Sequence, residues 1–170
     1  RQTINDYIAL LERVFLIDRL PAWHTNRLSR LVKSPKLHIG DTGLGCALLG
    51  LDTDALIGDR AAYGQLTESF VFQELRRLAS WAETPIEFSH FRDKDGVEVD
   101  LVLERGSREL AGIEVKAGAT VTSSDFRGLR KLRDIVGARF RAGVVLYDGA
   151  TVAGFADDMF AVPIRALWEL

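Results

Sequence analysis

Four residues combine types and spacings that could bind a metal ion and act on a phosphate ester: Glu68, Asp100, Glu114 and Lys116. Glu114 and Lys116 are two residues apart, so on a β-strand their side chains project from the same face. A hairpin turning near Ser107 would place Asp100 opposite Glu114. Adjacent carboxylates raise each other's pKa. A hard divalent cation such as Mg²⁺ or Mn²⁺ would relieve that repulsion, because it prefers oxygen ligands.

The other two residues have defined places in this hypothesis. Lys116 beside the cation could orient or help deprotonate a water molecule and stabilise charge on a phosphate. Glu68 lies in the apolar arc of a helix expected over residues 63–82, and it would complete the site if that helix covers the same face of the sheet. An ion pair between Lys116 and either Asp100 or Glu114 would explain the same residues without a metal. Both interpretations remain open at this point.

Three strands are expected to position these residues, over residues 86–92, 97–103 and 110–116. The Asp95-Gly96 pair marks a tight turn between the first two strands. Alternation of side chains predicts that Asp100, Glu114 and Lys116 share one face. The apolar residues predicted for the opposite face are Val97, Val99, Leu101, Ile113 and Val115.

Further elements complete the expected fold. A helix is predicted over residues 123–136, followed by an apolar strand over 142–147, of the kind buried on both faces of a sheet, and a last strand near 160–164. The pattern predicts the α/β class, with a mixed sheet flanked by helices.

The N-terminal segment has a different pattern. A helix over residues 4–13, a strand over 15–20, a loop and a strand over 37–39 follow one another, which is the order at the end of a winged helix. Residues 50–60 hold two glycines and three aspartates and suggest a boundary. We therefore predict a winged-helix remnant with a connecting helix over 1–57 and a second domain over 58–170. The basic and His residues of the loop, which contains no acid, are His24, Arg27, Arg30, Lys33 and Lys36.

Composition excludes several classes of protein. The chain has 170 residues, of which 47% are hydrophobic and 27% charged, as in ordinary globular proteins. A net charge of −2 excludes a globally basic nucleic-acid coat, so contact with DNA would need a local basic patch. One cysteine excludes an intrachain disulfide framework and a cysteine-based zinc site. Without a signal peptide or an apolar run of ~18–20 residues, we expect a cytoplasmic location and no membrane association.

The sequence resembles the PD-(D/E)XK nuclease-like superfamily in Gly64-x-x-x-Glu68, Asp100 and Glu114-Val115-Lys116. A closer resemblance covers nearly the whole chain. It is to a domain-of-unknown-function family that forms the C-terminal half of predicted bacterial and archaeal ATPases of the AAA type. The motifs of this closer resemblance are Lys33-Ser34-Pro35-Lys36-Leu37, Asp41-Thr42-Gly43-Leu44, Glu68-x-Phe70-Val71-x-x-Glu74-Leu75, Glu98-Val99-Asp100 and Ile113-Glu114-Val115-Lys116-x-Gly118.

The resemblance implies a restriction-endonuclease-like mixed sheet preceded by a partial winged helix. It also implies an upstream ATPase domain that this chain lacks, in line with the missing initiator Met. Asp100 and Glu114 would be metal ligands, Lys116 the catalytic lysine and Glu68 a supporting acid. Val99 stands where the superfamily usually has a proline. The chain has no G-x-x-x-x-G-K-[ST] loop, so no ATP site of that type is expected in it.

The first function that these observations allow is a Mg²⁺-dependent deoxyribonuclease. The cation would be held by the carboxylates, and basic side chains would contact the phosphates of DNA. The basic residues predicted for that contact are Arg92, Arg127, Arg130 and Lys131.

Two non-catalytic functions are the alternatives. In the first, the helix over 4–13 and the basic loop bind nucleic acid, with Arg27, Arg30 and Lys33 on phosphates. In the second, the chain docks on the ATPase part or on a second copy of itself through apolar residues such as Phe15 and Trp23. The oligomeric state is left open.

Overall fold

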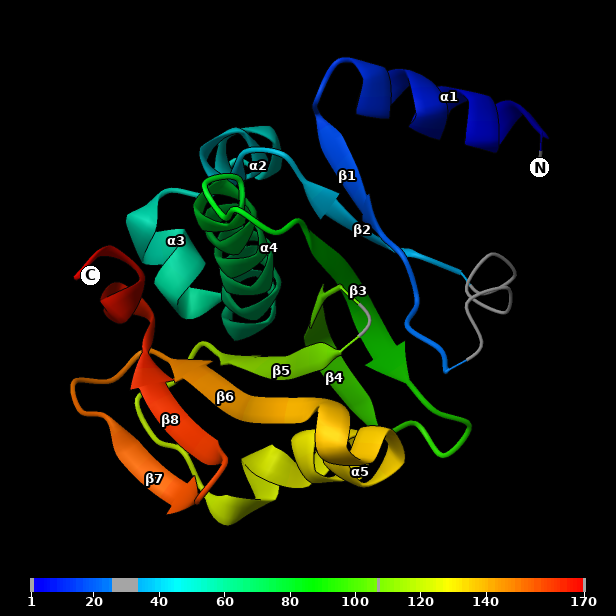
Figure 1. The fold of residues 1–170 in the computed structure, drawn as a ribbon. Coiled ribbons are helices and arrows are strands. Elements are labelled where there is room, and N and C mark those ends of the chain that lie inside the picture. Colours follow the sequence, from blue (N-terminus) through cyan, green and yellow to red (C-terminus); the bar gives the residue numbers. More distant parts are fainter. Residues whose placement is uncertain (1, 26–33, 107, 170) are drawn as a thin grey trace.

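The computed structural model describes residues 2–25, 34–106 and 108–169. A six-stranded mixed sheet has helices on both faces, and a helix with a small two-stranded sheet stands at the N-terminal end (Figure 1). The first elements are α1 (Gln2–Arg13), β1 (Ile17–Leu20), β2 (Lys36–Ile39), α2 (Thr42–Leu49), α3 (Thr53–Gly58) and α4 (Arg60–Ala79). The following ones are β3 (Ile86–Arg92), β4 (Glu98–Arg105), β5 (Glu109–Lys116), η2 (Ser123–Phe126), α5 (Arg127–Val136), η3 (Gly137–Arg139), β6 (Phe140–Tyr147), β7 (Ala153–Ala156), β8 (Met159–Pro163) and η4 (Ile164–Trp168).

The large sheet has the strand order β3-β4-β5-β6-β8-β7. Its first three strands form an antiparallel meander, and β5, β6 and β8 run parallel, with η2 and α5 connecting β5 to β6. The mixed α/β sheet predicted from the sequence is confirmed. In the β4–β5 hairpin Arg105 pairs with Glu109 and Leu101 with Ile113, which is the register that the spacing predicted.

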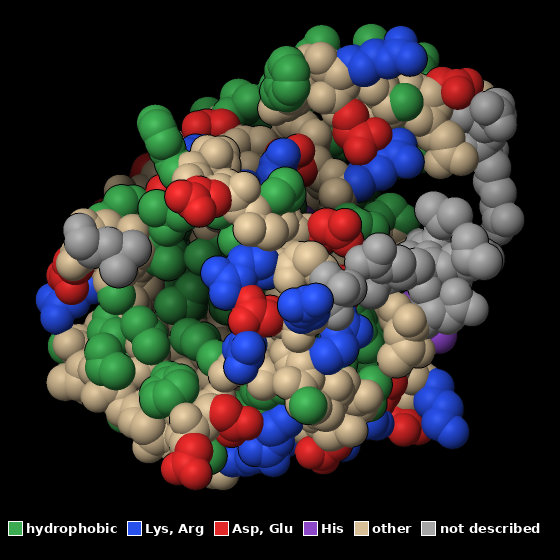
Figure 2. All heavy atoms as spheres, viewed as in Figure 1, with side chains coloured by type: hydrophobic (Ala, Val, Ile, Leu, Met, Phe, Trp, Pro, Cys, Tyr) green, Lys and Arg blue, Asp and Glu red, His purple; other side chains and the backbone are tan. Residues whose placement is uncertain are grey.

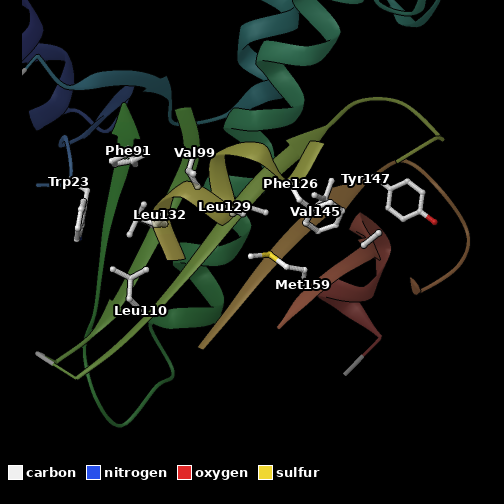
Figure 3. Packing of buried hydrophobic residues seen from close by; sticks show 12 residues of the cluster. Trp23, Phe91, Val99, Leu110, Phe126, Leu129, Leu132, Val145, Tyr147 and Met159 are labelled. Atoms are coloured by element: carbon white, nitrogen blue, oxygen red, sulfur yellow. The ribbon is translucent and has the colours of Figure 1, made fainter. Parts of the chain in front are cut away.

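The sheet separates two hydrophobic clusters, one under each helix layer. On one face, Val71 and Phe72 of α4 pack against Leu101, Ile113 and Leu146. The other face is covered by α5 (Figure 1). Figure 3 shows this second cluster, whose members include Phe126, Leu129, Leu132, Val99, Val145 and Met159. The site described below lies at an edge of the first layer, where α4 meets β4 and β2.

The predicted alternation along β4 was wrong at one point. Ser89 pairs with Val102 and Phe91 with Val99, so two steps along β3 match three steps along β4. The extra residue is a β-bulge, which reverses the alternation of side chains beyond it. Val99 therefore packs in the cluster under α5, whereas Leu101 packs in the cluster under α4.

The prediction that Asp100, Glu114 and Lys116 share one face of the sheet was also wrong. Ile113 and Val115 pack under α4, so Glu114 and Lys116 alternate toward the α5 side, whereas Asp100 is joined through Lys36 to Glu68 of α4.

The segment over residues 50–60 is more structured than the sequence suggested. It contains α3. Two of the aspartates that were expected to lie in a linker instead cap the start of a helix. Asp52 accepts a hydrogen bond from the backbone N–H of Ala55, and Asp59 accepts from Ala61 and Ala62. Such caps satisfy N–H groups that have no partner inside the helix. Helix α4 consequently begins at Arg60 and ends at Ala79, and strand β7 is a further element that the sequence did not indicate.

The N-terminal elements attach to the sheet through a short extended segment. β1 and β2 pair in antiparallel fashion, with Ile17 opposite Ile39. After β1, the backbone N–H of Trp23 donates to the His90 carbonyl at 2.6 Å, and the N–H of His90 donates to the Pro21 carbonyl at 2.9 Å. Helix α1 lies away from the large sheet (Figure 1). Among the described residues, no helix combines the length and apolar character required to cross a membrane.

Candidate functional site

The candidate site begins where β4 separates from β5. Pairing of the two strands ends at Leu101 and Ile113, while β4 continues alongside β3 as far as Glu98. At this point the Asp100 carboxylate takes the place of a strand partner, because its Oδ2 accepts a hydrogen bond of 3.0 Å from the Val115 N–H. The bulge in β4 and this hydrogen bond together fix the Asp100 carboxylate at the end of the hairpin.

A lysine joins Asp100 to helix α4. Lys36 Nζ, from the first residue of β2, lies 2.8 Å from Glu68 Oε1 and 3.1 Å from Asp100 Oδ1. His38, two residues further along β2, reaches the Ser69 hydroxyl at 3.1 Å and fixes the strand against α4. Three elements that are distant in sequence thus meet around one ammonium group. The structure brings the predicted residues Glu68 and Asp100 together, with Lys36 between them.

Glu114 adds a third carboxylate beside Asp100. Its Oε2 atom is buried and accepts no hydrogen bond from the part of the chain that the structure describes. Burial and the negative charge of Asp100 raise the pKa of Glu114 to about 8, against the opposing charges of Lys116 and Lys36. Burial and Asp100 also raise the pKa of Glu68. Glu114 therefore keeps its proton at neutral pH in the folded protein, unless a cation binds beside it.

Lys116 does not pair with either of the carboxylates that the sequence suggested. Its Nζ lies 2.8 Å from Asp125 Oδ1, and 41% of its side chain is exposed. Asp125 also accepts a hydrogen bond from the Thr122 N–H in the capping box of η2. The hydrogen bond from Lys116 lowers the pKa of Asp125, against the effect of its burial. Lys116 is consequently turned toward the start of the α5 segment, at one side of the carboxylates.

Several basic residues predicted to contact phosphates have acidic partners. Arg92 pairs with Glu98 at 3.0 Å, and Lys131 pairs with Asp93 and Asp95. Arg130 donates to the Ser123 carbonyl at 2.7 Å, and Arg127 is exposed on α5. Figure 2 shows acidic and basic side chains interspersed on the face in view.

The remaining predicted phosphate contacts belong to the basic loop. Arg27, Arg30 and Lys33 lie outside the described residues.

Two residues of the site escaped the sequence analysis, Lys36 and His38. Lys36 was counted with the basic loop, although its spacing from His38 places both side chains on one face of a strand. Burial and the charge of Lys36 lower the pKa of His38 to about 4. His38 is therefore neutral at physiological pH and acts here as a hydrogen-bonding residue of the core.

The donor set matches a divalent cation in its chemistry but not in its placement. Three carboxylates, one with an unsatisfied buried oxygen, match the chemistry that Mg²⁺ or Mn²⁺ requires. In residues 2–25, 34–106 and 108–169, however, no three Asp, Glu, His or Cys side chains are placed so that they could hold a metal ion together. The Lys36 ammonium stands between two of the carboxylates. The donors fit such an ion in kind, but the carboxylates would have to move closer together and the ammonium would have to move away to admit it.

Comparison with known proteins agrees with part of the resemblance seen in the sequence. Residues 63–167, more than half of the chain, match the family described as Domain of unknown function (DUF4143). The chain belongs to the DUF4143 family. Residues 1–55 match a second family, Domain of unknown function (DUF8612). Lys36 thus comes from the DUF8612 segment, and the three carboxylates come from the DUF4143 segment.

Two curated relatives are mycobacterial. Uncharacterized protein Mb2031c of Mycobacterium bovis and uncharacterized protein Rv2008c of Mycobacterium tuberculosis are each 31% identical to the chain over 162 residues, which is 95% of the chain. The chain spans 34% of the length of each relative. No solved structure matches the chain. The predicted kinship to a domain-of-unknown-function family is confirmed, and its links to ATPases and nucleases remain predictions.

The buried glutamate of the DUF4143 segment gives the protein an expected pH dependence. The pKa of Glu114 is about 8 in the folded state, above its ordinary value, so the folded state keeps a proton that the unfolded chain has lost. The free energy of unfolding should therefore fall as pH rises from about 6.5 to 8. The pKa of His38 is lowered from 6.5 to about 4, so its titration makes the free energy of unfolding rise with pH. This opposite effect is confined to pH values below about 6.5.

Urea unfolding in the presence of a chelator at several pH values measures this slope. Replacing Glu114 with Gln should flatten it and raise stability at pH 8, whereas the exposed control Glu83→Gln should leave it unchanged. An equal slope in the wild type and in Glu114→Gln would contradict the assignment.

Proposed function

We propose that the chain carries a nuclease-like site that hydrolyses nucleic-acid phosphodiesters with Mg²⁺ or Mn²⁺. One observation carries the proposal. Glu68 and Asp100, from two different elements, converge on a single ammonium, and the buried Glu114 carboxylate lies beside Asp100 where β4 leaves β5. Carboxyl groups placed this closely raise one another's pKa, and a bound cation would favour their ionised forms, which suits a cation-dependent reaction.

Each residue has a defined task in this proposal. Asp100 and Glu114 would hold the cation, and Glu68 would support them. When bound, the cation would lower the pKa of a water molecule and offset charge on the phosphate. Lys116 is exposed enough to turn from Asp125 toward a bound phosphate, where its ammonium would orient the water and stabilise negative charge.

The proposal extends to the fold family and to the wider protein. An antiparallel hairpin that continues through a helix into a parallel strand supports a restriction-endonuclease-like sheet. Helix α1 followed by the β1–β2 pair supports a partial winged helix. Association with an AAA-type ATPase domain is likewise part of the proposal, and it rests on the sequence resemblance.

A cleavage assay tests the proposed activity. Linear, single-stranded and branched DNA would be incubated with Mg²⁺ or Mn²⁺ and with the wild type, Asp100→Asn or Lys116→Ala. Each variant should lose about 100-fold or more in rate, the usual effect of removing a group that acts on the reacting atoms. Asp134→Asn, which changes an exposed aspartate on α5, is the matched control and should cut like the wild type. Undiminished cutting by Asp100→Asn would refute the proposal.

A non-catalytic module that binds DNA or a protein partner is the second candidate. It is favoured by the ion pairs of Lys36 and Lys116, which satisfy much of the acidic charge without any metal. The exposed apolar residues of α1, among them Ile4, Tyr7 and Leu10, favour docking on a partner. Absence of cutting, together with DNA binding that weakens steeply with salt, would support the DNA-binding form of this candidate.

A further inference from the structure

We propose that Lys36 is a built-in competitor of the divalent cation: its ammonium takes the position between Glu68 and Asp100, and a metal ion binds there only when Lys36 withdraws. This inference rests on the proposed function. It adds that a residue of the N-terminal β2 strand controls access to the carboxylates of the large sheet.

The contacts of Lys36 are those of a bound cation. Its Nζ lies within 3.1 Å of one oxygen from each carboxylate, and only 27% of its side chain is exposed. The ammonium donates a hydrogen bond to each of these carboxylates. A metal ion held by Asp100 and Glu114 would share the Asp100 carboxylate with this ammonium, and two cations at such short range would repel strongly. Occupancy by Lys36 and occupancy by a metal ion are therefore mutually exclusive.

The Lys36 ammonium can leave its position without any movement of strand β2. Lys36 is among the residues that line the pocket beside Glu68, and it also lines a second pocket with Asp93 and Glu98. The flexible four-carbon stem of a lysine allows its ammonium to move from one pocket to the other by rotation about side-chain bonds. The hydrogen bond between His38 and Ser69 keeps β2 in place meanwhile. Withdrawal thus needs a change of rotamer and no unfolding.

Titration of the metal-free protein with Mn²⁺, followed by calorimetry, tests the inference without relying on catalysis. Lys36→Met keeps the length of the stem and removes the charge, and Lys36→Gln is a second variant in case the first is unstable. We expect both to bind Mn²⁺ about tenfold or more tightly than the wild type, a typical size for coupling between two competing ligands. The exposed control Lys94→Met should bind like the wild type.

The possible outcomes separate the inference from the proposed function. Mn²⁺ binding that appears or tightens when Lys36 is replaced, and that Asp100→Asn then removes, supports the inference. Equal or weaker binding by the Lys36 variants than by a metal-binding wild type overturns the inference and leaves the proposed function standing. Absence of Mn²⁺ binding in the wild type and in both folded Lys36 variants overturns the proposed function and the inference together.

Discussion

Replacing Phe126 with Ala is expected to lower the free energy of unfolding by about 3–5 kcal/mol. The Phe126 side chain is 0% exposed and lies in the cluster between α5 and the sheet (Figure 3). Its ring centroid is 4.6 Å from that of Phe155. Truncation would remove these contacts and leave a cavity, because the surrounding strands cannot close fully around it.

Chemical unfolding followed by circular dichroism measures this loss. Phe15→Ala is the matched control, since the Phe15 ring is 84% exposed and its removal should change stability by no more than about 0.5 kcal/mol. Similar losses in the two variants would show that the α5 layer does not pack as described.

Replacing Gly128 with Ala should destabilise the protein by about 1–3 kcal/mol or more, as overpacking of a close contact does. Gly128 lies on α5 where the helix crosses β4. A Cβ atom at this position would lie 1.9 Å from the Glu98 carbonyl oxygen. A backbone oxygen cannot move aside as a flexible side chain can, so α5 would have to retreat from the sheet.

The same substitution at Gly64 should have the opposite sign. Gly64 lies within α4, and a Cβ atom there would meet no atom within 4 Å. Alanine should raise stability by about 0.5–1 kcal/mol at this position, because it favours the helix more than glycine does. Unfolding experiments on the two variants separate the steric effect of the added Cβ atom at position 128 from the helix preference of alanine at position 64. A gain in stability for both would contradict the close approach of α5 to β4.

The sequence was most informative about the β4–β5 hairpin. A period of two and a turn near residue 107 predicted the register of this hairpin, which agrees as far as Leu101 and Ile113, where the pairing ends. The β-bulge at Asp100 could not be predicted, because one extra residue in a strand leaves no signature in a pattern of alternating side chains. The capping aspartates Asp52 and Asp59 did carry a readable signal, the preference of Asp for helix N-termini.

The contacts that define the candidate site could not be predicted from the sequence, for a different reason. Lys36 is 32 positions from Glu68 and 64 from Asp100, and periodicity describes only local neighbours. The partner of Lys116 was also misjudged, because the capping box at the start of the α5 segment brings Asp125 to it. In both cases the sequence identified residues able to form ion pairs, and only the fold determined their partners.

The extended segment at residues 21–23 has a consequence for how the protein should be produced. Strand β3 is at the edge of the six-stranded sheet, and Ala22 pairs with His90 along its outer side while Trp23 packs edge-on against Phe91. Uncovered strand edges recruit other chains and promote aggregation. A recombinant fragment limited to residues 63–167 would expose this strand edge and the Phe91 ring against which Trp23 packs. We therefore expect the fragment to self-associate. We therefore expect a well-behaved fragment to begin before residue 21 and not at the boundary of the family match.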